Sequence, residues 1–166
     1  MTDVNTSKST PMTVLCVDDE LNILKSMKRL LYKQNYQVLL AESGAKALKI
    51  MQQHEVHLII SDMKMPEMSG AELLEKVATT FPEIYRILLT GYSDMESTIN
   101  AVNKGKIDRY LQKPWNNDEI IKTIDEGLEK VKLKNENINL QNLVKKQNKL
   151  LKGMNQSLEE KVKLRT

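Results

Sequence analysis

Five short apolar segments follow one another along the first two thirds of the chain, with more polar segments between them. They are MTVLCV (12–17), YQVLLA (36–41), HLIIS (57–61), YRILLT (85–90) and IDRYLQ (107–112). Their β-branched and aliphatic residues do not alternate cleanly with polar ones, which is typical of strands covered on both faces. The pattern therefore predicts five buried β-strands.

The segments between these strands repeat apolar residues at spacings of three and four, which indicates amphipathic helices. Ser43 is expected to cap one of them and Gly105 to end another. The helices are expected at 20–34, 43–54, 70–80 and 94–103. Their core-facing residues are expected to be Ile23, Leu24, Met27, Leu30 and Leu31; Ala47, Leu48 and Met51; Gly70, Leu73, Leu74 and Val77; and Ile99 and Val102.

Strands that alternate with helices through short connections predict an α/β fold with a parallel sheet and helices on both faces. Right-handed crossovers leave few topologies. For five such units the expected fold is the flavodoxin-like, doubly wound sheet with strand order 2-1-3-4-5.

The pattern changes after Pro114, where a long segment without proline begins. Apolar residues first recur at Ile121, Ile124, Leu128 and Val131. A second, heptad-spaced seam comprises Leu140, Val144, Gln147, Leu151, Met154 and Leu158, and is widened by Leu143 and Leu150. Such a seam is typical of a coiled coil, and a parallel homodimer would bury it. The two seams differ in register, so a weak or re-phased stretch is expected at Asn135, Asn137 and Asn139.

Composition divides the chain in the same way. Residues 128–166 carry 10 Lys and Arg against 4 Glu, a net charge of +6, so the overall +3 leaves −3 for residues 1–127. We expect a flexible leader over 1–11, an α/β domain over 12–127 and a helical coiled coil over 128–166. The lysines Lys145, Lys146, Lys149 and Lys152 lie between leucines without aromatic residues, so a solvated flank is expected rather than nucleic-acid contact.

No apolar stretch approaches the ~20 residues that would cross a bilayer, and the polar N-terminus lacks the layout of a signal peptide. A single cysteine, Cys16, excludes an internal disulfide framework. These features predict a cytoplasmic protein without membrane insertion.

Chemically informative residues lie at the carboxyl ends of the predicted strands, where an open parallel sheet binds its ligands. They are Asp18, Asp19, Asp62, Thr90 and Lys113. Three adjacent carboxylates need a cation, and an all-oxygen site suits Mg²⁺. Metal, ammonium and hydroxyl groups together would accommodate a phosphoryl group, which one carboxylate could accept as a nucleophile.

The motifs VDDE (17–20), SDMKMP (61–66), LTGYSD (89–94) and YLQKPW (110–115) resemble those of bacterial two-component response regulator receiver domains over about residues 12–127. The resemblance implies a phosphoacceptor at Asp62 and a Mg²⁺ site formed by Asp18, Asp19, Asp62 and the backbone carbonyl of Lys64. It also implies that Thr90 bonds a phosphoryl oxygen and that Lys113 pairs with that group or with Asp62.

The same resemblance implies a switch formed by Thr90 and Tyr110 and a cis Lys113–Pro114 bond. It implies a sensor histidine kinase or phosphotransfer protein as partner. The sequence around LTGYSD and the tail NQSLEEKVKLRT resemble a narrower group in which an output domain, often of HD-GYP type, follows the helix. An output domain is therefore expected beyond Thr166, and a receiver whose only output is the coiled coil is the alternative, since residues 1–166 carry no HD or GYP motif.

Other function classes fit the sequence less well. A phosphatase of the haloacid dehalogenase type needs a second acid two residues after its nucleophile, where this chain has Lys64. No organic cofactor is expected, because neither GxGxxG after the first strand nor GxxxxGK[ST] occurs. A coiled-coil adaptor with an inert receiver stays open. The expected function is signalling, without turnover of outside substrates.

Lys64 and Tyr92 stand two residues after Asp62 and Thr90. We expect their side chains at the mouth of the site, where they would hinder the hydrolytic water and prolong the phosphorylated state.

Overall fold

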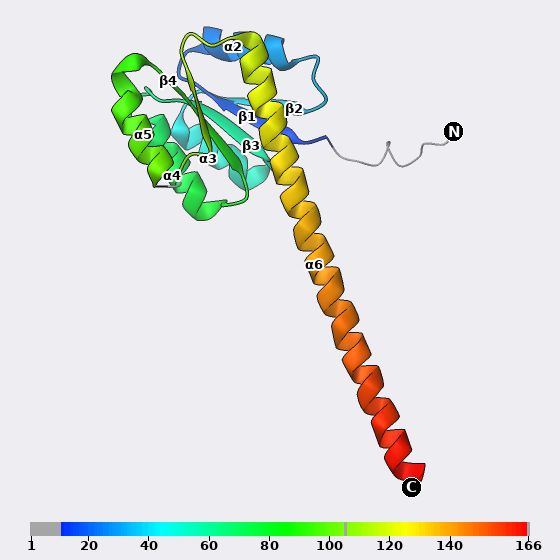
Figure 1. Cartoon of the computed structure of the whole chain (residues 1–166). Helices are drawn as coiled ribbons and strands as arrows, with labels where there is room; N and C mark the ends of the chain where they lie inside the picture. The colour runs from blue at the N-terminus through cyan, green and yellow to red at the C-terminus, as the bar shows by residue number, and fades with distance from the viewer. Residues whose placement is uncertain (1–10, 105, 166) are drawn as a thin grey trace, which may run out of the picture. The chain divides into compact units, whose positions relative to one another are not determined.

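The computed structural model describes residues 11–104 and 106–165, with side chains as far as residue 155. Five strands among these residues form one parallel sheet in the predicted order, β2-β1-β3-β4-β5 (Figure 1). The strands are β1 (Thr13–Val17), β2 (Gln37–Ala41), β3 (Leu58–Asp62), β4 (Tyr85–Thr90) and β5 (Arg109–Gln112). The register sets Asp62 beside Leu89 and Thr90 beside Gln112, so the strands end nearly level.

The helices begin close to the predicted positions. They are α2 (Leu21–Leu31), α3 (Gly44–Gln53), α4 (Gly70–Thr80), α5 (Met95–Asn103) and α6 (Asn117–Arg165), with a 3-10 turn, η1 (Tyr92–Asp94), before α5. Ser43 caps α3 as predicted, because its hydroxyl accepts the Lys46 N–H at 3.2 Å. The expected leader over residues 1–10 and the helix stop at Gly105 lie outside the described residues.

Two hydrophobic cores lie on opposite faces of the sheet. Helix α2 and the first part of α6 cover one face, and α3, α4 and α5 cover the other (Figure 1). The three central strands are buried along their whole length, as the lack of alternation predicted.

Two core positions differ from the predicted pattern. In the first turn of α6 the fully buried residue is Ile120, and the predicted Ile121 is only partly buried. In α5 the buried residue is Thr98, whereas Ile99 is 47% exposed. In α6 the difference is confined to the first turn, since Ile124, Leu128 and Val131 are buried as predicted. In α5 Thr98 takes the place of Ile99, while Val102 packs against the core as predicted.

The chain divides into two compact units, Met1–Val131 and Lys132–Thr166. Leu128 and Val131 belong to the core of the first unit, so its packing extends past the predicted boundary at residue 127. Helix α6 passes through Asn135–Asn139 as uninterrupted helix.

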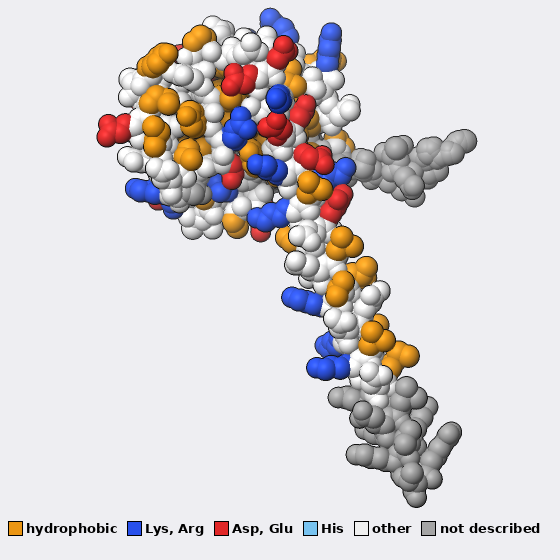
Figure 2. Space-filling model, viewed as in Figure 1, with side chains coloured by type: hydrophobic (Ala, Val, Ile, Leu, Met, Phe, Trp, Pro, Cys, Tyr) orange, Lys and Arg blue, Asp and Glu red, His pale blue; other side chains and the backbone are white. Residues whose placement is uncertain are grey.

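The described part of the second unit exposes its apolar residues. Eight of them are 42–68% exposed: Leu133, Ile138, Leu140, Leu143, Val144, Leu150, Leu151 and Met154. In Figure 2 apolar side chains lie along one side of this helix and lysines along the other. The expected seam residue Leu158 lies outside the side chains that the structure describes.

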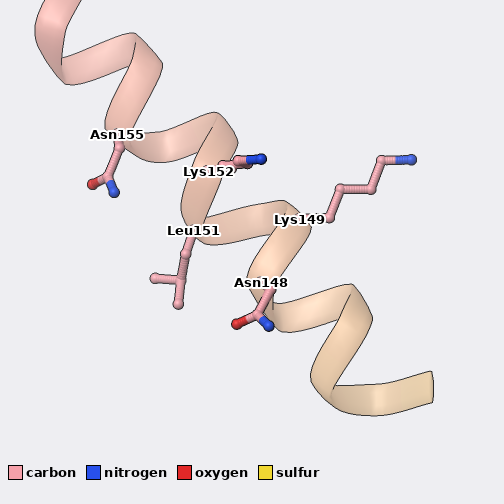
Figure 3. A pocket seen from close by; sticks show the side chains of 5 residues that line it. All are labelled: Asn148, Lys149, Leu151, Lys152 and Asn155. Carbon is pink, nitrogen blue, oxygen red and sulfur yellow. The ribbon is translucent and has the colours of Figure 1, made fainter. Parts of the chain in front are cut away.

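Figure 3 shows the same division at closer range, where Leu151 points away from Lys149 and Lys152. None of the helices among the described residues is long and apolar enough to cross a bilayer.

Candidate functional site

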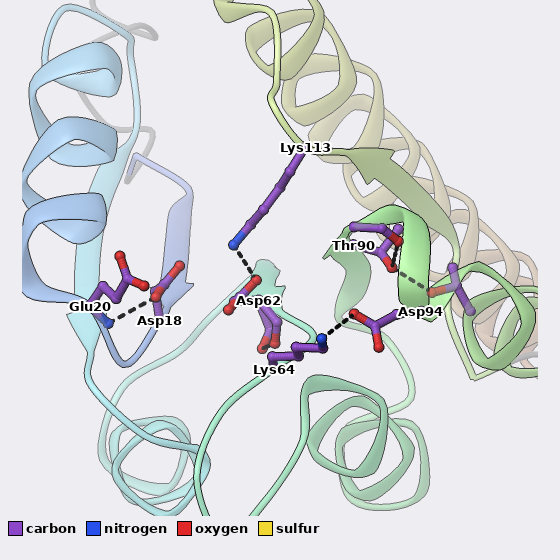
Figure 4. Close-up of polar contacts among 10 residues, drawn as sticks. Asp18, Glu20, Asp62, Lys64, Thr90, Asp94 and Lys113 are labelled. Carbon is purple, nitrogen blue, oxygen red and sulfur yellow. Dashed lines mark hydrogen bonds and ion pairs between the residues drawn. The ribbon is translucent and has the colours of Figure 1, made fainter.

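The carboxyl ends of four strands bring the predicted residues to one edge of the sheet (Figure 4). Asp62 and Thr90 are the last residues of β3 and β4, and Asp18 and Lys113 directly follow β1 and β5. Backbone hydrogen bonds hold these ends together, since the Asp18 N–H donates to the Ala41 carbonyl and the Lys113 N–H donates to the Thr90 carbonyl.

Three carboxylates form a cluster at this edge. Asp18, Asp19 and Asp62 each offer an oxygen, and these oxygens lie within 4.8 Å of one another. Asp18 and Asp62 are buried, whereas Asp19 is exposed. The cluster thus opens to solvent on the Asp19 side, which gives a cation a path to the buried oxygens.

The surroundings of Asp18 favour a cation. Burial raises the pKa of Asp18 to about 6, and the charge of Asp62 adds to this, while a hydrogen bond from the Glu20 N–H opposes it. The other oxygen, Oδ2, is buried and has no hydrogen-bond partner among the described residues. An unpaired buried carboxylate oxygen beside two other acids fits a hard divalent cation such as Mg²⁺.

Asp62 is paired with the lysine that the sequence predicted. The Lys113 ammonium lies 2.5 Å from Asp62 Oδ1. The Lys113–Pro114 peptide bond is cis, as the resemblance implied. The carboxylate of Asp62 therefore has a positive group on one side and two acids on another.

Thr90 is completely buried and is hydrogen-bonded to another element. Its hydroxyl accepts a hydrogen bond of 2.9 Å from the hydroxyl of Thr98 in α5 and donates to the Gly91 carbonyl at 3.3 Å. Sequence reasoning missed Thr98, because threonine is not part of an apolar helix pattern. Tyr110 lies in β5 and is 39% exposed.

Lys64 spans the mouth of the site. Its ammonium lies 3.2 Å from Ser93 Oγ and 4.0 Å from Asp94, which links the loop after β3 to η1 (Figure 4). Tyr92, in the same turn, is 84% exposed. Both side chains are exposed, and the expected role of Tyr92 at the mouth of the site stays a prediction. The role of the Lys64 backbone carbonyl stays a prediction.

Gly70 lies directly against the backbone carbonyl of Asp62, a contact that the sequence pattern did not predict. A Cβ at Gly70 would overlap the backbone carbonyl of Asp62 and would lie 2.7 Å from the side chain of Leu88. The Gly70 N–H also donates to the Met63 carbonyl at 2.8 Å. Helix α4 can begin this close to β3 only because residue 70 has no side chain.

The arrangement suits acceptance of an anionic, tetrahedral group. It combines a buried carboxylate as nucleophile, an ammonium group, a hydroxyl and oxygen ligands for a divalent cation at one strand edge. Phosphoryl transfer depends mainly on positioning and charge neutralisation, and these groups provide both.

Comparison with known proteins points to the same chemistry. Residues 14–125 match the model of the response regulator receiver domain. The hydrogenase transcriptional regulatory protein HoxA of Bradyrhizobium diazoefficiens is 32% identical over 124 residues, which are 75% of this chain and 25% of that protein. The chain thus spans about a quarter of the length of the curated relatives it matches.

Solved structures agree in fold. An uncharacterized protein from Neptuniibacter caesariensis is 44% identical, with a TM-score of 0.74 over 76% of this chain and 93% of that one. The signal receiver domain of an HD domain-containing protein from Pseudomonas fluorescens Pf-5 is 34% identical, with a TM-score of 0.70 over 74% of this chain and 98% of that one. The chain belongs to the response regulator receiver domain family of two-component systems.

Proposed function

We propose that Asp62 accepts a phosphoryl group and that residues 12–131 act as a phosphorylation-controlled switch. The observation that carries this proposal is the single strand edge at which the Asp62 carboxylate meets both the Lys113 ammonium and the oxygens of Asp18 and Asp19. Membership of the receiver family supports the same assignment.

The proposed reaction transfers a phosphoryl group from a phosphohistidine donor to the Asp62 acceptor. An oxygen of the Asp62 carboxylate attacks the phosphorus of a phosphohistidine on a kinase or phosphotransfer protein, and a P–O bond forms as the P–N bond breaks. The imidazole leaves and takes up a proton. Hydrolysis later returns the carboxylate and releases inorganic phosphate.

Asp18, Asp19, Asp62 and the backbone carbonyl of Lys64 would hold Mg²⁺. When bound, the cation supplies positive charge that offsets the phosphoryl oxygens. Lys113 contributes a second positive charge on the other side of Asp62. The buried, unpartnered Oδ2 of Asp18 supports this ligand set.

Thr90 and Tyr110 are proposed to report the modification. Once a phosphoryl group is present, the Thr90 hydroxyl donates to it and leaves space beside β5. The ring of Tyr110, which is 39% exposed without the modification, then moves inward. The surface formed by α5, β5 and the first part of α6 thereby shifts between two packings.

The second unit is proposed to pair with its counterpart in another copy of the chain. The exposed apolar side of residues 132–155 would be buried in a parallel coiled coil, with the lysines on its outer side. An output domain following the coil would receive the signal. Among the structural neighbours, one is an adenylate cyclase from Rhodopirellula baltica and another comes from an HD domain-containing protein.

A phosphatase with an aspartyl-phosphate intermediate is disfavoured by one residue. The position two residues after Asp62 is Lys64, whose ammonium is engaged by Ser93 and Asp94. The carboxylic acid that such an enzyme uses there as its general acid is absent from this position. A signalling function in the cytoplasm is the better proposal.

Phosphate uptake from acetyl phosphate tests the proposed function. The parent chain should gain one phosphoryl group in the presence of Mg²⁺ and none after chelation. Asp62→Asn should gain none, while Asp118→Asn, which changes an acid in the first turn of α6, should behave like the parent. Equal uptake by the parent and Asp62→Asn would overturn the assignment.

A further inference from the structure

Thr98 links α5 to the end of β4 through a buried contact between two hydroxyl groups. Thr98 and Thr90 are both 0% exposed, and the Thr98 hydroxyl donates to Thr90 Oγ1 at 2.9 Å. Two residues eight positions apart are thus joined across two elements that both border the acidic cluster.

This contact differs from those that other helical threonines of the chain make. Thr79 and Thr123 donate their hydroxyls back to the carbonyls of Glu75 and Glu119, one helical turn earlier. Such back-bonding is the usual outcome for threonine inside a helix. Thr98 instead uses its proton on the side chain of Thr90.

In this arrangement the Thr90 hydroxyl is engaged away from Asp62. In Figure 4 its dashed hydrogen bonds lead toward its own chain and toward α5, whereas Asp62 lies on the opposite side. To donate to a group on Asp62, the Thr90 hydroxyl must withdraw its proton from the Gly91 carbonyl. A shift of its oxygen toward Asp62 would also lengthen the contact with the Thr98 hydroxyl.

We propose that Thr98 is a positioning residue that holds Thr90 in its unphosphorylated arrangement and so opposes phosphoryl binding at Asp62. The inference rests on the proposed roles of Asp62 and Thr90. Its physical basis is that departure of Thr90 leaves a buried donor on Thr98 without its partner.

The expected size of the effect is modest. One intramolecular hydrogen bond changes an equilibrium constant by a factor of about 2 to 12. Removing the Thr98 hydroxyl should therefore strengthen binding of a phosphoryl analogue about fivefold.

Titration of beryllofluoride with Mg²⁺, followed by ¹⁹F NMR, measures this directly, because the ion forms a tetrahedral adduct on a carboxylate. Thr98→Val keeps the shape of the side chain and removes the hydroxyl, and it should bind the analogue about fivefold more tightly than the parent. Thr98→Ser keeps the hydroxyl and should bind like the parent. Thr98→Ala serves as a second variant should the valine protein fail to fold.

Thr123→Val is the matched control, because Thr123 is also buried but donates its hydroxyl within α6, to the carbonyl of Glu119. It should leave analogue affinity unchanged, even where it lowers thermal stability. Equal or weaker binding by Thr98→Val, beside a parent that binds, would overturn the role of Thr98. A parent that binds no analogue would instead overturn the proposed function.

Discussion

Asp18 and Asp62 are both buried carboxylates, but their surroundings compensate their charges differently. Asp62 has the Lys113 ammonium 2.5 Å away, whereas Asp18 has one oxygen bonded to the Glu20 N–H and the other without a partner among the described residues. A bound cation would therefore relieve Asp18 more than Asp62.

Mg²⁺ affinity should fall as the pH drops below about 6. Burial raises the pKa of Asp18 from 3.8 to about 6, so the folded protein binds a proton there that competes with the cation. Calorimetric titration should give binding roughly tenfold weaker at about pH 5 than at about pH 7.5, because one pH unit below the pKa leaves about a tenth of the carboxyl ionised. Asp18→Asn should bind Mg²⁺ weakly at both pH values. Equal Mg²⁺ affinities of the parent chain at the two pH values would contradict this prediction.

The metal-free domain should show the opposite trend in stability. A carboxyl whose pKa is higher in the folded state than in the unfolded state binds protons more tightly when folded. Its contribution is fully present below the ordinary value of 3.8 and is lost as the pH rises through about 6. In the presence of a chelator, the free energy of unfolding should therefore lose this contribution as the pH rises from 3.8 to about 6.

If the exposed ring of Tyr92 hinders the hydrolytic water, as its position two residues after Thr90 predicts, Tyr92→Ala should shorten the life of the phosphorylated state several-fold. The dephosphorylation rate after removal of the phosphodonor measures this. Tyr32→Ala removes a similarly exposed tyrosine, at the end of α2, and should leave the rate unchanged. An unchanged rate in Tyr92→Ala would eliminate the idea.

At the level of elements, the site depends on how closely helix starts approach strand ends. Helix α4 begins against the backbone of Asp62, and α5 begins just after Thr90 and reaches it through Thr98. Each of these helices therefore fixes one side of the site through a contact with the strand before it.

Gly70→Ala should destabilise the domain by about 1–3 kcal/mol, the usual cost of overpacking. Its Cβ would meet the carbonyl of Asp62, which is backbone and cannot swing away. Thermal unfolding should show a lowered midpoint. Gly91→Ala is the matched control, since a Cβ there meets nothing within 4 Å and the backbone angle φ of −97° suits alanine. Equal midpoints in the two variants would refute this reading of the contact.

The sequence predicted the elements and the strand-end residues well, since apolar runs and the acids after them are local features. Asp18, Asp62, Thr90 and Lys113 meet as the topology required. The contacts of Thr98 and Gly70 could not be predicted, because they depend on how closely two elements approach. Apolar spacing likewise favoured Ile99 as a core residue, although in the fold its polar neighbour Thr98 is the buried one.

At the scale of the whole molecule, the chain combines a receiver domain with a helix whose apolar side is exposed. Residues 132–155 contain eight apolar side chains that are 42–68% exposed, a pattern expected of one partner of a coiled coil. Pairing of this segment would place two receiver domains in one assembly.

Leu151→Glu should weaken dimerisation by a factor of about 10² to 10⁴, because each dimer loses two leucines that are worth roughly 1.5–3 kcal/mol each when buried. Light scattering after gel filtration, over a range of concentrations, would follow the change in mass. Lys149→Glu introduces the same residue on the opposite side of the helix and should stay dimeric (Figure 3). A parent chain that is monomeric at every concentration would exclude the coiled coil.

The central claim is that Asp62 itself carries the phosphoryl group, and borohydride trapping tests it most directly. Reduction of an aspartyl phosphate converts that aspartate to homoserine, which peptide mass spectrometry locates. After incubation with acetyl phosphate and Mg²⁺, homoserine should appear at position 62, in the peptide containing SDMKMP. Homoserine at position 18 or 19, or its absence from a protein that has taken up phosphate, would contradict the account.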